Sequence, residues 1–526
     1  MFLLLGACST ASEAPRGTIG FVRGFLGGVA ADEPNAALIG RDILSAGGSA
    51  ADAATATYFA LSVTMPSSAS LGGGGVCLVY DNGKGTTEAL DFLPRGPGAV
   101  AQDTVRPNAV PGNVRGFFAL HSKYGRLRWA QILRRAETLA RFGIPVSRAI
   151  ARDLATVEES LMVVPEVRRV FGRKDGKGAV RERDFLIQVD LAGVLSRLRN
   201  NGPGDFYQGR LARQLVDAAN DSGGSLRIED LREFAPRWHD TLEVPFGDLT
   251  VHFSPPPPPA GAVAAEMWLM LEDGGRYRDA AENERHHLLA EVSLRAFADR
   301  GRWMRDDEGS RLKPQELVSP DRVSSLMADY RPDRHRPAPA PLPAPRLENP
   351  AATSFVVVDR EGSAVACSVT MNNLFGNGQI ARGTGIFLAA LPGRGGRGFT
   401  SLGPMLVINH NVSQFFLAAA ASGGVTAPGA MIGVAARSLL AKQSLAEALA
   451  AKRLHHGAVP DLTYYEKDMS ETVLESLIGR GHKIGATVRL GQVNAIWCPG
   501  GLPRAPESCA TEVDPRGYGL AVTADQ

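Results

Sequence analysis

The chain has 526 residues, of which 44% are hydrophobic and 21% are charged, and its formal net charge is +2. These values are ordinary for a globular protein with a large core, and they argue against nucleic acid or an anionic membrane as the main partner. After the N-terminal residues, no stretch reaches the roughly 18 apolar residues that a membrane helix needs.

The first residues resemble the end of a bacterial export signal. Leu5 to Cys8 match a lipobox, in which the cysteine is lipidated and becomes the mature end. Because the basic and apolar regions of a signal peptide are incomplete, we expect a start codon placed too late, with residues 1–8 as a signal remnant. The expected product is a periplasmic or membrane-anchored lipoprotein, and the alternative is a chance match in a cytosolic protein.

Capping residues and glycine runs predict the elements of the first hundred residues. Residues 28–63 contain a helix capped by Asp32 and ending at Gly47, followed by an alanine-rich helix capped by Ser49. A glycine-rich run then leads into two predicted strands, 76–80 and 87–92. Helices followed by a hairpin favour a mixed α/β layered fold.

The middle of the chain is predicted to be mostly helical from 111 to 300, with helices ending at 124 and covering 129–142, 191–200 and 209–220. A strand at 249–253 precedes five prolines that form either a stiff spacer or an ordered loop lid. Residues 331–350 are rich in proline and alanine and are expected to form an exposed tether. Strands are then predicted at 355–359, 364–370, 385–389, 404–409, 484–497 and 518–523, and helices at 427–440 and 445–452.

The five cysteines do not form a disulfide framework. Cys77 and Cys367 lie in apolar strands and are expected to be small core residues, whereas Cys498 and Cys509 flank a loop and could pair in an exported protein. No CxxC motif or histidine-rich cluster indicates a metal site, and we expect no metal and no cofactor. Two adjacent histidine pairs are expected at the surface, His286-His287 and His455-His456.

The hairpin after the tether carries the strongest functional signal. A flexible segment followed at once by a buried hairpin that begins near Thr353 predicts a cleavage site. Cleavage would make the threonine a chain terminus whose own amine can act as its base, as in N-terminal nucleophile hydrolases.

Over nearly its whole length the chain resembles the gamma-glutamyltranspeptidases. The matching segments occur in the family's order, at residues 47–54, 72–75, 89–92, 110–117, 201–209, 298–300, 370–376, 422–424 and 514–516. The resemblance implies a four-layer α/β/β/α sandwich of the N-terminal nucleophile hydrolase type. It also implies a precursor that cuts itself into a large and a small part, here residues 9–352 (with the tether at 331–350) and 353–526.

The resemblance also implies a reaction and assigns residues to it. The new N-terminal threonine attacks a γ-glutamyl amide, typically glutathione, and the acyl group passes to water, an amino acid or a peptide. Gly423-Gly424 would hold the oxyanion and Thr370 would orient the nucleophile. Asn372 would contact the α-amino acid end of the substrate, and Thr400-Ser401 would bind its α-carboxylate.

The sequence departs from the family at the nucleophile. The family has Thr-Thr at the start of the small part, and counting back from Asp359 places Ala352 at the first position and Thr353 at the second. Because side chains alternate along a strand, Thr353 would point the other way unless a bulge or a shorter strand corrected the offset. We predict Thr353 as the nucleophile, and the alternative is a strand residue in an uncleaved chain.

The substrate-binding residues depart as well. Leu93 stands where the family has its carboxylate-binding arginine, and Arg95, two residues on, either binds a carboxylate or forms a surface salt bridge. The run 385–396 holds no carboxylate for the substrate's ammonium. The predicted function is therefore a self-processing enzyme acting on a γ-glutamyl or related amide. The alternatives are a catalytically inactive binding or structural lipoprotein and a cytosolic acylase.

Overall fold

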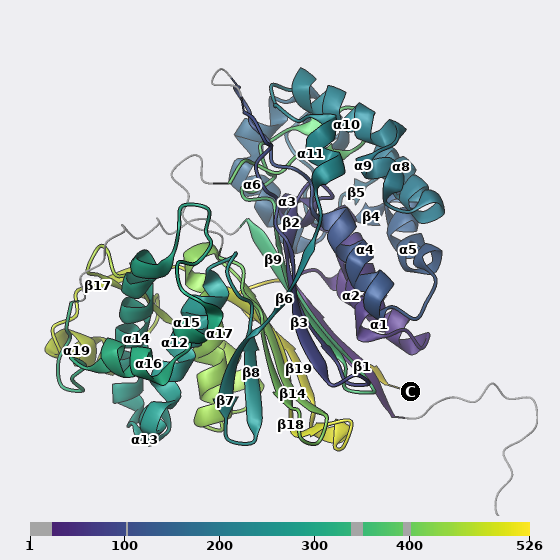
Figure 1. The fold of residues 1–526 in the computed structure, drawn as a ribbon. Coiled ribbons are helices and arrows are strands. Elements are labelled where there is room, and N and C mark those ends of the chain that lie inside the picture. The colour runs from purple at the N-terminus through teal and green to yellow at the C-terminus, as the bar shows by residue number, and fades with distance from the viewer. Residues whose placement is uncertain (1–23, 101–103, 338–350, 393–400, 526) are drawn as a thin grey trace, which may run out of the picture.

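The computed structural model describes residues 24–100, 104–337, 351–392 and 401–525. Two stacked β-sheets form the centre of the molecule, and helices cover the outer face of each sheet (Figure 1). This is the expected α/β/β/α sandwich. In the described ranges, none of the helices combines the length and the apolar character that crossing a membrane requires. The predictions for residues 1–8 and for 338–350 lie outside the described residues.

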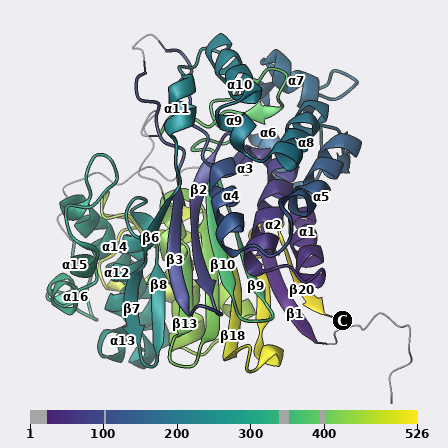
Figure 2. The same cartoon turned by 45° about the vertical axis from the view of Figure 1, so that its right-hand side comes forward.

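The first sheet has seven antiparallel strands, which Figure 2 shows side by side. Their order across the sheet is β20 (Leu520–Asp525), β1 (Phe25–Ala31), β9 (Ala352–Asp359), β10 (Ala364–Thr370), β2 (Gly74–Asp81), β3 (Thr86–Phe92) and β6 (Arg237–Asp240). The hairpin predicted after the tether thus lies in the middle of this sheet. Its two strands are buried along almost their whole length, because a layer of the fold covers each face.

The second sheet has six antiparallel strands, β19 (Ala510–Val513), β18 (Gln492–Leu502), β14 (Gln414–Ser422), β13 (Met405–Asn409), β8 (Leu249–Phe253) and β7 (Leu242–Phe246). Apolar side chains of both sheets, among them Val356, Val358, Ile408 and Phe415, form the core between them. Burial of each such side chain contributes about 1.5–3 kcal/mol.

Helices form the two outer layers. The first sheet is covered by α1 (Pro34–Ser45), α2 (Ala50–Thr64), α4 (Asn113–Tyr124), α5 (Trp129–Phe142) and α8 (Val189–Asn201). The second is covered by α12 (Ala260–Glu272), α14 (Glu282–Trp303) and α17 (Ala427–Ala435), which a π-helical turn over Ala436–Leu440 continues. Every residue of α2 is buried, and its many alanines let it lie close against the sheet.

Smaller elements complete the fold. The helices are α3 (Pro66–Ala69), α6 (Arg148–Met162), α7 (Pro165–Phe171), α9 (Gly204–Tyr207), α10 (Arg210–Asp221), α11 (Ile228–Glu233), α13 (Arg276–Asp279), α15 (Pro314–Leu317), α16 (Pro320–Met327), α18 (Leu445–Ala450) and α19 (Glu471–Gly479). A three-stranded sheet comprises β15 (Leu454–His456), β16 (Thr463–Glu466) and β17 (Ile484–Thr487). Two short strand pairs are β4 (Ile144–Pro145) with β5 (Phe185–Leu186), and β11 (Ile380–Ala381) with β12 (Ile386–Phe387).

Local sequence signals predicted many of these boundaries. Strands β8 and β10 have the predicted bounds, and Ser49 caps α2 with a reciprocal bond from Asp52. The prediction that Asp32 caps α1 is wrong, because the capping side chain is Glu33, which accepts a hydrogen bond from the Ala36 N–H. Residues 25–31 form a strand rather than the start of a helical stretch.

The cysteines form two disulfides. Cys498 and Cys509 are bonded, as the sequence allowed. The prediction that Cys77 and Cys367 are only core residues is wrong, because they face each other across β2 and β10 and are bonded.

The surface location predicted for the two histidine pairs is also wrong. His286, His287, His455 and His456 are all buried, each less than 9% exposed. His287 and His456 each belong to one of two groups of histidines and carboxylates that sequence spacing alone did not reveal.

Candidate active site

The candidate site lies at the end of the first sheet where β9 begins and β10 ends. The two strands pair in a regular register that places Ala352 opposite Thr370 and Thr353 opposite Val369. The register contains no bulge, so the offset of one residue seen in the sequence persists in the structure. The residue that faces Thr370 is therefore Ala352, which has no hydroxyl group.

Hydrogen bonds show which face of β9 and β10 points toward the second sheet. The Ser354 hydroxyl donates to the Ala420 carbonyl at 3.1 Å, and the Ser368 hydroxyl donates to the Ala421 carbonyl at 3.1 Å. Because alternate residues of a strand share a face, Ala352 also points toward the second sheet, near the end of β14.

Thr353 points away from this inner face and is fully buried. Its hydroxyl donates to an Asp32 carboxylate oxygen at 2.9 Å, and the Ser354 N–H donates to the same oxygen at 3.0 Å. The other oxygen of Asp32 accepts from the side-chain amides of Asn494, at 2.9 Å, and Gln492, at 3.2 Å. Burial raises the pKa of Asp32 although these hydrogen bonds oppose the shift.

Thr370 holds the backbone just ahead of β9. Its hydroxyl donates to the carbonyl of Ala351 at 3.0 Å and accepts from the N–H of Asn372 at 2.9 Å. The side-chain amide of Asn372 donates to the Ala390 carbonyl at 2.9 Å. Thr370 and Asn372 thus lie together beside the peptide that leads into Ala352.

Gly423 and Gly424 form the turn that follows β14. Both have a positive φ, +127° and +60°, which residues with a side chain rarely adopt. Gly424 begins a short 3₁₀ turn that leads into α17, and the first N–H groups of such a turn have no partner inside it. The turn can therefore present backbone donors to an oxyanion, and the oxyanion role of Gly423-Gly424 stays a prediction.

A Gly423→Ala variant is expected to lose at least tenfold in kcat/KM for amide hydrolysis. A β-carbon there would lie 2.6 Å from the Gly491 α-carbon, and its φ is unfavourable, so the turn would shift at a cost of about 1–3 kcal/mol in folding stability. The control is Gly433→Ala on α17, where a β-carbon meets open space and activity should not change. Equal activity of both variants would show that the turn does not contribute to catalysis.

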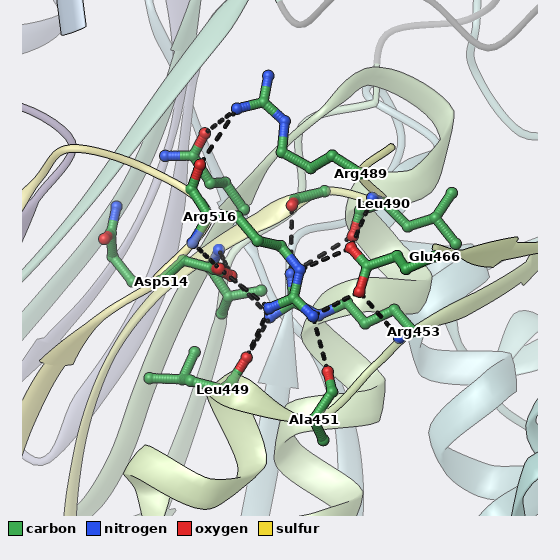
Figure 3. A network of polar contacts seen from close by, with 12 residues as sticks. Leu449, Ala451, Arg453, Glu466, Arg489, Leu490, Asp514 and Arg516 are labelled. Carbon is green, nitrogen blue, oxygen red and sulfur yellow. Dashed lines mark hydrogen bonds and ion pairs between the residues drawn. The ribbon is translucent and has the colours of Figure 1, made fainter. Parts of the chain in front are cut away.

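A buried ionic network, shown in Figure 3, is connected to this turn through the loop at 490–491. The guanidinium of Arg516 binds the carbonyls of Leu449 and Ala451 and the carboxylate of Glu466. Asp514 accepts from Arg453 at 2.6 Å. Burial of a pair of this kind is costly unless every group has a partner.

The network ends on the loop that packs against Gly423. Arg453 also donates to the carbonyl of Gly491 at 3.2 Å, and the N–H of Leu490 donates to Glu466 at 2.9 Å. These bonds fix the backbone of Gly491 beside Gly423. The segment 514–516, noted in the sequence only as a matching motif, therefore positions the turn at 423–424.

The residues predicted to bind the substrate carboxylate have other contacts in the structure. Arg95 forms an ion pair with Asp91 at 2.6 Å, which is the salt-bridge alternative. Leu93 packs with Val76 and Leu402 against Ala352, so the space beside Ala352 is apolar. Ser401 is buried next to Leu402, whereas Thr400 lies outside the described residues.

Sequence reasoning missed the polar groups around Thr353. Asp32 was interpreted as a helix cap, yet it is the hub of four hydrogen bonds that join β9 and β18. Arg152 and Arg489 lie within electrostatic reach of this carboxylate. Only the long-range contact between residues 32 and 353 reveals these roles, and no local pattern signals it.

Comparisons with known proteins agree with this architecture. A family model described as Gamma-glutamyltranspeptidase matches residues 36–524. The glutathione hydrolase proenzyme of Escherichia coli (strain K12) is 28% identical, and the alignment covers 94% of this chain and 93% of that protein. The glutathione hydrolase proenzyme of Pseudomonas aeruginosa is also 28% identical, covering 94% of each chain.

Two solved structures extend the comparison to the fold. The cephalosporin acylase from Bacillus halodurans superposes with a TM-score of 0.81 at 22% identity over 99% of both chains, a likeness of fold alone. The gamma-glutamyltranspeptidase of Helicobacter pylori has a TM-score of 0.53 at 25% identity, covering 62% of this chain and 95% of that chain.

Proposed function

Because the chain belongs to the gamma-glutamyltranspeptidase family, we propose that it is a self-processing enzyme that cleaves or transfers a γ-glutamyl or related amide through Thr353. The observation that carries the proposal is the family match over nearly the whole chain, with Thr353 at the start of β9, one residue after the position that faces Thr370. The E. coli and P. aeruginosa relatives are named as hydrolase proenzymes, so they do not support an inactive binding protein.

In the proposed reaction the Thr353 hydroxyl attacks the carbonyl carbon of the amide. The new α-amine of Thr353 takes the hydroxyl proton and gives it to the leaving amine as the C–N bond breaks. The N–H groups of the turn at Gly423-Gly424 hold the oxyanion. Water or an acceptor amine then attacks the ester, the C–O bond to Thr353 breaks, and the hydroxyl regains its proton.

The contact with Asp32 suggests how the Thr353 hydroxyl, which points away from the inner face of the sheet, becomes available for attack on the substrate. Cleavage of the bond between Ala352 and Thr353 leaves only the Cα–C bond of Thr353 to fix its orientation. Rotation about that bond would place the new amine against Asp32 and remove the hydroxyl from that contact. When the amine takes the hydroxyl proton, the resulting ammonium lies against the carboxylate and favours its ionised form.

The surroundings of the site support an acyl group with an apolar part. Leu93, Val76 and Leu402 border Ala352, and Arg95 is held by Asp91. Arg489, near Asp32, is the cation proposed to receive the carboxylate of a γ-glutamyl substrate, because Arg152 is paired with Asp153. We propose glutathione or a related amide as donor, and water, an amino acid or a peptide as acceptor.

The proposal includes the two-part organisation and the location. Residues 9–352 and 353–526 would be the large and small parts, with the tether ahead of the cut. Two disulfides suit an oxidising compartment, which supports a periplasmic or membrane-anchored lipoprotein.

Glutamate release from glutathione by the purified protein tests the proposed function. Release that rises in proportion to the fraction of cleaved chain, and aminolysis when a dipeptide is added, are the expected results. A fully cleaved protein that releases no glutamate from glutathione or from a chromogenic γ-glutamyl anilide would contradict the proposed substrate class.

The disulfide between Cys77 and Cys367 predicts how the cleaved protein runs on a gel. These cysteines lie on opposite sides of residue 353. Cleavage should therefore give two bands with reductant and a single band without it. In a Cys367→Ala variant two bands should appear in both lanes, and two bands from the unreduced wild type would show that this disulfide does not form.

A further inference from the structure

Two histidines and a carboxylate from distant parts of the chain converge beside α14. His287 and Glu291 lie one turn apart on this helix and so share a face, and His482 lies between α19 and β17. His287 Nδ1 and His482 Nε2 are 2.8 Å apart, and Glu291 Oε1 is 3.8 Å from His482 Nε2. All three side chains are buried.

The outer atoms of both rings are already bound. His287 Nε2 lies 2.9 Å from the Arg331 carbonyl, which can only accept, so this nitrogen carries a hydrogen. His482 Nδ1 lies 3.0 Å from the Thr463 hydroxyl, which can accept in the same way. In the tautomer with both outer nitrogens as donors, the two inner nitrogens would present lone pairs to each other, as in metal-binding histidines whose second nitrogen is held by an outer acceptor.

A third histidine, His335, adjoins this group and faces a carboxylate with each of its ring nitrogens. His335 Nδ1 is 2.6 Å from the same Glu291 oxygen, and His335 Nε2 is 2.9 Å from a carboxylate oxygen of Asp461. The other oxygen of Glu291 accepts from Arg295 at 2.6 Å, which fixes the orientation of the carboxylate.

The distances match the size of a tetrahedral zinc site. With Zn–N and Zn–O bonds of about 2.0–2.1 Å, neighbouring ligand atoms lie about 3.3 Å apart. The contacts between His287 and His482 and between His482 and Glu291 are 2.8 and 3.8 Å, which bracket this value, and the three ligand atoms all lie within 4.8 Å of one another. Imidazole nitrogens with one carboxylate oxygen are a donor set that suits Zn²⁺.

We propose that His287, Glu291 and His482 bind a structural Zn²⁺ ion, with a water molecule in the fourth position. All three ligands are buried, so the ion would hold these segments of the fold together rather than act on a substrate. The ion would join α14, which precedes residue 353, to the β16–β17 region, which follows it. It would thus connect the two parts of the chain independently of whether cleavage occurs.

Metal analysis of the full-length protein tests the site. After dialysis against a chelator and addition of Zn²⁺ alone, we expect one equivalent per chain and a higher Tm, because the ion binds only the folded state. A His482→Ala variant should lose this equivalent. Thr463→Val, which removes only an outer partner, should weaken the affinity by roughly 10- to 100-fold.

The matched control is a second pair of histidines whose ring nitrogens lie within hydrogen-bonding distance. His252 Nε2 and His410 Nε2 are also 2.8 Å apart, but the carboxylate nearest to His252 is 3.9 Å away on the exposed Glu243. His410→Ala should therefore keep the zinc equivalent. Co²⁺ added to the wild type should give tetrahedral absorption bands, a readout that does not depend on the folding of any variant.

Three results would overturn the zinc site. They are a wild type that retains no zinc, a His482→Ala variant that binds as tightly as the wild type, and a Co²⁺ spectrum without tetrahedral bands. Each would mean that protons, and not a metal ion, hold these rings together.

Discussion

Replacing Thr353 with alanine is expected to abolish chain cleavage and to lower the rate of amide hydrolysis by about 10³-fold or more, the scale seen when a catalytic nucleophile is removed. The substitution removes the hydroxyl that cleavage would release at the head of β9 and leaves the sheet intact, because Thr353 pairs through its backbone with Val369. A gel under reducing conditions and a glutamate-release assay measure the two effects.

The control for this variant is Thr353→Ser. Serine keeps a hydroxyl that can donate to Asp32, so cleavage and part of the activity should persist. If the alanine and serine variants both cleave and hydrolyse like the wild type, Thr353 is not the nucleophile.

Replacing Ala352 with threonine is expected to raise kcat/KM by about 10- to 100-fold and to move the cut to the bond after Ala351. The new hydroxyl would face Thr370 on the inner face of the sheet, so it would not need the rotation about the Cα–C bond that is proposed for Thr353. Misplacement of a reacting group by about 1 Å costs roughly 100-fold in rate. Mass spectrometry of the smaller fragment reports the position of the cut.

Ala352→Val separates the hydroxyl from its volume, because valine has the shape of threonine. This variant should cleave at the wild-type position and show no gain in activity, since valine only adds to the apolar contacts with Val76, Leu93 and Leu402. A gain equal to that of the threonine variant would show that packing, and not the hydroxyl, limits the wild-type reaction.

Local signals in the sequence predicted the frame of the site. Apolar residues and the turn at 360–363 predicted β10 with its observed bounds and the second part of β9, and the structure pairs Ala352, the residue counted to the family's nucleophile position, with Thr370. The four-layer order came from the family resemblance, whereas capped helices followed by a hairpin indicated a mixed α/β layered fold. These features depend on interactions within a few residues, which a single sequence records.

Contacts between distant segments were not predictable in this way. Asp32 and Thr353 are 321 residues apart, and the rings of His287 and His482 are 195 residues apart. The pairing of Cys77 with Cys367 likewise depends on strand order. An aspartate before a helix is ordinarily expected to cap that helix. Only the folded structure shows that Asp32 instead accepts hydrogen bonds from residues at the start of β9.

Sequencing the N-terminus of the smaller fragment tests the central claim most directly. The proposed mechanism predicts a fragment that begins with Thr353, in an amount that parallels the hydrolytic activity. An uncut chain that is active, or a fragment that begins at any other residue, would contradict Thr353 as the terminal nucleophile.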